Sequence, residues 1–250
     1  HPFNWEEEFK DVMDAGGFDV VIGNPPYLLL QPQNTEEELL EYVKKKFFVA
    51  QYKIDDYHLF LERGISLLRD GGILGFITPN TYLMNIYTSN LRKYILDNCR
   101  ILQIISIPLE VFPDASVDTS IIIVQKEKNE KRRKENEVKV FLASNLSEAP
   151  SEIKTIKQDV FLQNKNLIFN IGASKKNAGI AEKLTVESVL LGAIARISFG
   201  LQTLSKDEYV KNKPAGARWK PCIDGRDITR YSLKFNSQYF LHDVKIKAGG

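Results

Sequence analysis

Four consecutive residues, Asn24-Pro25-Pro26-Tyr27, place an amide, two carbonyls and an aromatic ring at the end of an apolar run, residues 18–23. The run predicts a β-strand, and ligands of open α/β sheets bind at the carboxyl ends of strands. Two prolines fix φ twice and remove two N–H donors. The residue before a proline is also pushed out of the helical region. The turn is therefore expected to be stiff, with the carbonyls of Asn24 and Pro25 free to accept.

This set of groups suits an exocyclic amine, which has two hydrogens to donate. The side-chain oxygen of Asn24 and a backbone carbonyl can accept both, which would aim the nitrogen lone pair at a methyl donor. Tyr27 can stack on the ring that carries the amine. No strong base is needed, because the proton can leave after methylation. The alternative is a proline-rich turn that only ends a strand, and four residues leave both interpretations open.

Four sequence blocks resemble, in order, the motifs of DNA adenine-N6 methyltransferases. The likeness is greatest to Eco57I-like restriction-modification enzymes and to the TaqI-type enzyme. The blocks are GGFDVVIGNPPY (16–27) for motif IV, DDYHLF (55–60) for motif V, GGILGFITPN (71–80) for motif VI, and VFP with VDTSIII (111–123) for motif VIII. Four blocks at family-like spacing are more specific than any one of them.

The resemblance implies a role for each matched site residue. Asn24 and the Pro25 carbonyl would hold the adenine amine, Tyr27 would stack on one face of the base, and Phe112 would contact its other face or edge. The base must leave the duplex, because paired N6 cannot be reached. The implied cofactor is S-adenosylmethionine and the implied partner is double-stranded DNA. For Phe112, a core position before a strand remains the alternative.

Two blocks near the C-terminus resemble the start of a TaqI-like target-recognition domain. They are GLQT (200–203) and GRDITRY (225–231). Gln202, Arg226 and Arg230 are the candidate DNA-binding residues, since arginine binds phosphates and guanine edges. A second interpretation, in which Arg226 braces a turn with Asp227, stays open.

Charge is distributed unevenly along the 250 residues, although the net charge is only +2. Residues 151–250 carry 17 basic and 9 acidic side chains, whereas residues 1–150 carry 17 basic and 23 acidic ones. A basic C-terminal portion fits a phosphate backbone, and a solvated charged surface is the alternative.

Membrane and metal classes find no support in the sequence. No apolar stretch approaches membrane-span length and no signal peptide opens the chain, so we expect a cytoplasmic protein without membrane contact. Cys99 and Cys222 belong to no CxxC pair or Cys/His cluster, which predicts neither a disulfide framework nor a metal site.

The elements expected to position these residues alternate between strand and helix, which predicts a largely parallel sheet. The expected strands are 18–23, 73–77, 101–107 and 121–124, and the expected helices are 3–14, 35–48, 55–69 and 86–97. Residues 126–139 predict an exposed hairpin loop, with 138–142 as the returning strand. In the helix from residue 55, Phe60 is predicted to join the buried stripe and His58 to lie on the surface.

The predicted fold class is α/β: the C-terminal half of a Rossmann-like methyltransferase sheet, then part of an α+β target-recognition domain. Residues 1–145 would form the catalytic part, 146–180 a connection, and 181–250 the start of the recognition domain. Only 23 residues precede Asn24, and none forms the glycine-rich turn that holds the cofactor. We therefore expect a fragment that lacks the N-terminal part of its parent enzyme. Alone, it would bind S-adenosylmethionine weakly or not at all and be inactive.

Two other functions remain open. One is a DNA-binding specificity module without catalysis of its own, which a glycine-rich turn encoded upstream of His1 in the parent gene would exclude. The other is a protein-glutamine N-methyltransferase, since that class also uses Asn-Pro-Pro-Tyr. Phe112-Pro113 and the basic C-terminal portion argue against it.

Overall fold

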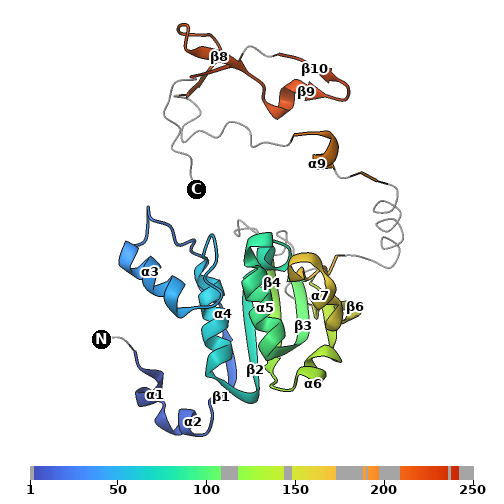
Figure 1. The fold of residues 1–250 in the computed structure, drawn as a ribbon. Coiled ribbons are helices and arrows are strands. Elements are labelled where there is room, and N and C mark those ends of the chain that lie inside the picture. The colour runs from blue at the N-terminus through green and yellow to red at the C-terminus, as the bar shows by residue number, and fades with distance from the viewer. Residues whose placement is uncertain are drawn as a thin grey trace. The chain divides into compact units, whose positions relative to one another are not determined.

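A computed structural model describes residues 3–107, 118–143, 148–172, 188–189, 191–196, 209–235 and 238–241. The chain divides into two compact units, His1–Gly179 and Ile180–Gly250 (Figure 1). The expected positions Phe112 and Gln202 lie outside the described residues.

A six-stranded sheet forms the centre of the first unit. Its strands are β1 (Phe18–Gly23), β2 (Leu68–Pro79), β3 (Cys99–Ile107), β4 (Thr119–Lys126), β5 (Glu137–Leu142) and β6 (Ser151–Lys157). The order is β1-β2-β4-β3-β5-β6. β1 is parallel to β2 and β3 to β5, whereas β4 and β6 run antiparallel to their neighbours. The α/β class is confirmed, and the sheet is mixed rather than largely parallel.

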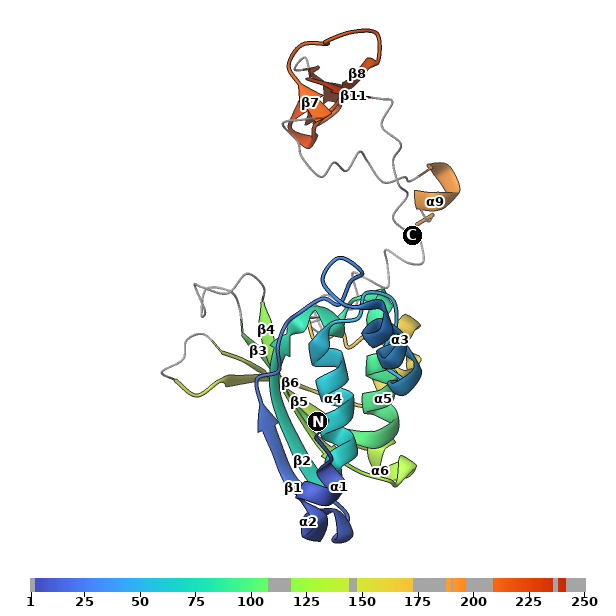
Figure 2. The same cartoon turned by 90° about the vertical axis from the view of Figure 1, so that its left-hand side faces the viewer.

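Helices cover one face of this sheet, as Figure 2 shows for α4 and α5. The helices of the unit are α1 (Trp5–Glu8), α2 (Lys10–Asp14), α3 (Glu37–Lys46), α4 (Asp56–Leu67), α5 (Ser89–Asn98), α6 (Glu130–Lys134) and α7 (Asp159–Gln163). Short 3-10 turns are η1 (Asn80–Leu83), η2 (Ile86–Thr88) and η4 (Lys165–Leu167). Apolar residues spaced by three and four along α4 and α5, such as Leu61, Ile65, Leu91 and Ile95, are buried against the sheet.

Gly64 lets α4 approach the sheet closely. A Cβ at this position would lie 2.6 Å from Leu74 Cδ1 in β2 and 3.3 Å from the ring of Phe76. The absence of a side chain at Gly64 therefore sets how near the second half of α4 can come to β2.

The predicted hairpin over residues 126–139 is wrong. The segment contains α6, and β5 pairs with β3 and β6 rather than with β4. The Asn129 side chain caps α6 by accepting from Arg132 N–H at 3.1 Å, and Glu130 pairs with Lys134 at 2.6 Å. A parallel β3–β5 pair needs a crossover connection, and this segment is part of it.

The predicted connection over residues 146–180 also differs from the structure where it is described. Residues 148–172 add the edge strand β6 and helix α7 to the first unit, and Phe161 and Phe169 are fully buried in its core. Gln158 ties this added segment to β3: its Nε2 donates to the Cys99 carbonyl and its Oε1 accepts from Ile101 N–H, both at 2.8 Å.

Among the strands that the structure describes, β1 forms one edge of the sheet and pairs only with β2. On its face away from α4, Val20 is 61% exposed and Ile22 84% exposed. Both side chains are large and apolar, so in this unit β1 presents an uncovered hydrophobic face.

The described part of the second unit holds short strands, one α-helical turn, α9 (Leu191–Ile194), and the 3-10 turn η5 (Gly225–Asp227). An antiparallel sheet has the order β7-β11-β8, and β9 pairs with β10 as a hairpin. Their bounds are β7 (Val210–Lys211), β8 (Trp219–Cys222), β9 (Ile228–Thr229), β10 (Ser232–Leu233) and β11 (Gln238–Leu241). Across the described ranges of both units, no helix is long and apolar enough to cross a membrane.

Candidate active site

The Asn24-Pro25-Pro26-Tyr27 turn follows directly after β1, at the edge of the sheet where β2 and β3 also end. Pro25 is buried, which anchors the turn, while Asn24 is exposed. Within the described part of the chain, the Asn24 side chain forms no hydrogen bond, and neither carbonyl of Asn24 or Pro25 is accepting one. One amide and two carbonyls are therefore available to a ligand.

Tyr27 is held in place but remains partly open. Its hydroxyl donates to the Ile77 carbonyl in β2 at 3.2 Å, and its ring makes a T-shaped contact with Tyr57, with centroids 6.3 Å apart. The side chain is 41% exposed. Partial burial raises the pKa of Tyr27, so the phenol stays protonated and keeps its hydrogen bond. A fixed, half-open ring is suited to stacking.

The residues after Tyr27 are tied to the start of α4. Leu30 N–H donates to the Ile54 carbonyl at 2.8 Å, and Asp56 N–H donates to the Leu28 carbonyl at 3.0 Å. Leu29 and Asp55 form an antiparallel bridge between these bonds. The turn is thus held on one side by β1 and on the other by the helix start.

The start of α4 contains a polar cluster that the sequence did not reveal. Asp55 and His58 form a capping box, in which Asp55 N–H donates to His58 Nδ1 at 3.3 Å. The prediction for His58 was wrong: the residue is only 5% exposed, and its ring packs against that of Tyr57. Phe60, predicted to be buried, is 48% exposed. Burial lowers the pKa of His58 to about 4, so the ring is neutral near pH 7.

Tyr57 links this cluster to the turn. Its ring makes T-shaped contacts with His58 at 4.3 Å and with Tyr27 at 6.3 Å between centroids. Its hydroxyl and Thr81 Oγ1 share a hydrogen bond of 3.2 Å. No local sequence pattern marks this contact, because Thr81 is 24 residues away.

A cavity of about 280 Å³ adjoins Thr81 at the ends of β2 and β3. Its described lining residues are Asn80, Thr81, Leu83, Met84, Ser106, Asn170, Ile171 and Gly172. Asn80 N–H donates to the Asp118 carbonyl at 3.0 Å, which joins the end of β2 to the residue before β4. The candidate turn therefore has a hollow on the same edge of the sheet.

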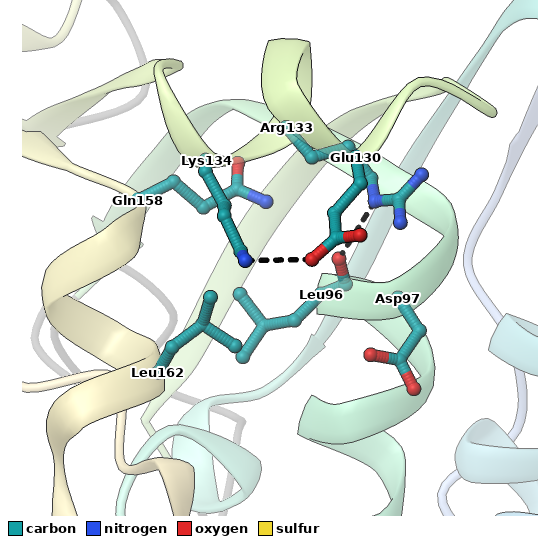
Figure 3. Close-up of a pocket in the computed structure, with 7 residues that line it drawn as sticks. All are labelled: Leu96, Asp97, Glu130, Arg133, Lys134, Gln158 and Leu162. Carbon is teal, nitrogen blue, oxygen red and sulfur yellow. Dashed lines mark hydrogen bonds and ion pairs between the residues drawn. The ribbon is translucent and has the colours of Figure 1, made fainter.

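A larger cavity, of about 420 Å³, lies at the opposite ends of the strands, where α5 leads into β3 (Figure 3). Its charges are already used within the protein. Lys134 pairs with Glu130, and Arg133 Nε donates to the Leu96 carbonyl at 3.2 Å. The first pair lies within α6 and the second bond holds α6 against α5, so we assign this cavity a structural role.

In the second unit, Arg226 and Arg230 flank a hairpin. Arg226 lies in the 3-10 turn Gly225–Asp227, with its guanidinium 3.4 Å from the Asp224 carboxylate. Arg230 and Tyr231 form the tip between β9 and β10, where the guanidinium lies 5.3 Å from the centre of the exposed Tyr231 ring. Lys234 N–H closes the base of the hairpin by donating to the Asp227 carbonyl at 2.7 Å.

The described residues do not form a cofactor cradle or a metal site. Gly16 and Gly17 have positive φ and join α2 to β1; a Cβ on Gly17 would lie 2.4 Å from the Leu67 carbonyl. These glycines serve close packing, and do not form a strand-to-helix turn for a nucleotide. In the ranges that the structure covers, no group of three or more His, Cys, Asp or Glu side chains could hold a metal ion.

Residues 1–112 match the model of the Eco57I restriction-modification methylases. This part of the chain is similar to that family. The resemblance read from the four sequence blocks is thereby confirmed.

Curated relatives of this segment are much longer than this chain. The type II restriction enzyme and methyltransferase RM.Eco57I of Escherichia coli is 34% identical over 116 residues, which are 45% of this chain and 12% of that protein. The type II methyltransferase M.BstVI of Geobacillus stearothermophilus is 32% identical over 103 residues, 41% of this chain and 18% of that one. The matched segment spans between a tenth and a fifth of the length of such curated relatives.

A solved structure with a similar course is the type IIG restriction endonuclease BpuSI. The TM-score is 0.49 at 17% sequence identity, and the match covers 91% of this chain and 32% of that protein.

Proposed function

We propose that this chain is part of a site-specific DNA methyltransferase that transfers a methyl group from S-adenosylmethionine to N6 of an adenine flipped out of duplex DNA. One observation carries the proposal. The exposed Asn24 amide, without a hydrogen bond in the described structure, lies three residues before a tyrosine ring that two contacts hold half open.

In this proposal the turn binds the adenine amine through hydrogen-bond acceptors alone. Asn24 Oδ1 and the Pro25 carbonyl accept the two N6 hydrogens, and the stiffness of the two prolines holds these oxygens in place before the base arrives. Tyr27 stacks on one face of the adenine, and Phe112 is assigned to the other. The chain's residues bind and orient the base, and the proton leaves N6 after the methyl group has been added.

The methyl group comes from S-adenosylmethionine, which the rest of the parent protein would bind. We expect the 250-residue chain alone to bind this cofactor weakly and to be inactive, since its described residues offer no glycine-rich cradle. Tight binding in calorimetry would contradict this. Residues 1–145 are assigned to catalysis and 181–250 to DNA recognition, with Gln202, Arg226 and Arg230 as contacts. Such an enzyme acts where the DNA is, in the cytoplasm.

Methyl transfer to duplex DNA by the full-length protein tests the grip of the turn. Asn24→Ala removes the amide oxygen and should lower kcat by about 100-fold or more, as loss of one preorganised group at a reacting centre does. Asn98→Ala, at the far end of α5, is the matched control and should leave kcat unchanged. Activity retained by Asn24→Ala would refute the proposal.

Stacking is tested separately at Tyr27. Tyr27→Ala removes the ring and should weaken catalysis by about 10- to 100-fold, the size of one lost base–aromatic contact. Tyr27→Phe keeps the ring, loses only the hydrogen bond to Ile77, and should lose about threefold. Equal losses in both variants would show that the hydroxyl, and not the ring, is what matters.

The second candidate is a DNA-binding specificity module without catalysis of its own. The observation in its favour is the hairpin tip, where Arg230 and the exposed Tyr231 ring lie together. DNA binding by the full-length protein, with no methyl transfer to any duplex or to a glutamine-containing peptide, would support it over the enzyme.

A further inference from the structure

We propose that Tyr57 is a positioning residue that sets the orientation of the Tyr27 ring, and that His58 and Thr81 fix Tyr57 for this purpose. The inference rests on the proposed function, because it gives Tyr27 the task of receiving a base. It adds a residue of α4 that touches the turn and not the substrate.

The contacts form a continuous chain from α4 to the turn. The rings of His58 and Tyr57 lie 4.3 Å apart at 69°, and those of Tyr57 and Tyr27 lie 6.3 Å apart at 80°. Edge-to-face pairs are directional, so the tilt of one ring constrains the next. The hydroxyl of Tyr57 is hydrogen-bonded to Thr81 at the start of η1, and that of Tyr27 to the Ile77 carbonyl near the end of β2. Both rings are therefore fixed at neighbouring positions of the chain.

The polar groups around Tyr57 are arranged at a cost to folding. His58 Nε2 and Asp55 Oδ1 are both buried without a hydrogen-bond partner in the described structure. Native proteins pair nearly all such atoms, and exceptions call for an explanation. An apolar residue at position 58 would avoid one of these unpaired atoms. The histidine at this position supplies both the capping contact to Asp55 and the ring that packs against Tyr57.

Tyr57 and Tyr27 differ in burial, and therefore in the roles that they can have. Tyr57 is only 2% exposed and belongs to the hydrophobic core, so a base cannot reach its ring. The open ring is that of Tyr27. An effect of Tyr57 on the reaction must therefore pass through Tyr27, which is what distinguishes a positioning residue from one that contacts substrate.

The test uses the full-length protein and two duplexes. Methyl transfer is measured on a duplex with the target adenine. Extrusion of the base is measured on a duplex with 2-aminopurine at that position, because 2-aminopurine lacks the N6 amine and its fluorescence rises when it leaves the stack. Tyr57→Leu should lower kcat and the fluorescence rise by about tenfold while KM for DNA changes by less than about threefold. Tyr57→Phe should lie between this variant and the wild type. Tyr94→Phe, on α5 and away from the turn, is the control.

A milder variant covers the case in which Tyr57→Leu fails to fold. Thr81 is exposed, so Thr81→Val removes the partner of the Tyr57 hydroxyl with little risk to the core. It should lower kcat by about threefold with KM unchanged. Wild-type kcat and fluorescence in both Tyr57→Phe and Thr81→Val would overturn the inference. A wild-type protein that methylates no duplex would instead refute the proposed function.

Discussion

His58 is kept neutral at the first turn of α4, next to the segment that follows Tyr27. Burial lowers its pKa to about 4 from an ordinary value of 6.5. Between these two values the unfolded chain binds a proton that the folded chain does not. The free energy of unfolding therefore falls as the pH drops through this window. The loss of stability affects the candidate site, because His58 also caps the helix that holds the turn.

We expect the free energy of unfolding of the chain to fall by about 2 kcal/mol from this group alone between pH 8 and pH 5. His58→Gln keeps a residue suited to the third position of a capping box and removes the titration. Urea unfolding at the two pH values measures the difference. Burial raises the pKa of Asp55, so this group makes the folded chain more stable as the pH falls, opposite to His58. Asp55 is present in both the wild type and His58→Gln. An equal pH slope in both would contradict the assignment to His58.

Residues whose roles follow from neighbours in the chain were predictable, and residues buried by distant segments were not. Two prolines after an apolar run suffice to predict an exposed Asn24 at a strand end. Helical periodicity put His58 outside and Phe60 inside, because it carries no information on contacts between distant parts of the chain, such as the bridge between Leu29 and Asp55. The Tyr57–Thr81 contact was missed for the same reason.

At the scale of elements, Arg92 joins α5 to the segments around it. Its buried guanidinium donates to the carbonyls of Tyr82, Asn85 and Asn166 and to Thr88 Oγ1. Its pKa falls to about 10 through burial, so it remains charged near neutral pH. The acceptors come from η1, η2 and η4, and η1 begins directly after β2 at the edge that carries the candidate site.

Replacement of Arg92 by leucine should destabilise the first unit by about 3 kcal/mol or more, because several buried acceptors lose their donor. Lys93→Ala is the matched control: it removes an exposed pair with Asp97 and should change stability by less than about 0.5 kcal/mol. Urea unfolding followed by circular dichroism gives both values. A loss below about 1 kcal/mol for Arg92→Leu would show that water replaces the guanidinium.

The strands β1 to β5 were foreseen in the sequence, but their partners were not. Alternation of strand and helix says nothing about β4 entering between β2 and β3. β6 escaped notice because it is an edge strand with exposed positions such as Ile153 and without a clear apolar period. α6 has no apolar face, and only its cap at Asn129 and its charged pairs could have indicated it.

At the scale of the whole chain, the proposed function places chemistry and recognition in different compact units. The turn lies in His1–Gly179, and the arginine hairpin lies in Ile180–Gly250. The sequence carries a net excess of acidic side chains before residue 151 and of basic ones after it. A basic unit attracts DNA through counterion release, independently of the base sequence.

A double variant, Arg226→Ala with Arg230→Ala, should weaken duplex binding by this chain about tenfold and reduce the salt slope by about 2. Fluorescence anisotropy at two salt concentrations measures both. Lys213→Ala with Lys220→Ala removes the same charge elsewhere in the unit. If the control loses as much affinity as the hairpin variant, net charge explains binding and the hairpin has no special role.

The uncovered edge of β1 has a practical consequence for anyone who handles this chain. A parallel edge strand with free backbone groups and two protruding aliphatic side chains is a template for adding strands from other molecules. Concentrated samples should therefore self-associate through β1, forming oligomers that grow with concentration. Changing Ile22, which protrudes most, to lysine would be the simplest way to keep the preparation monodisperse.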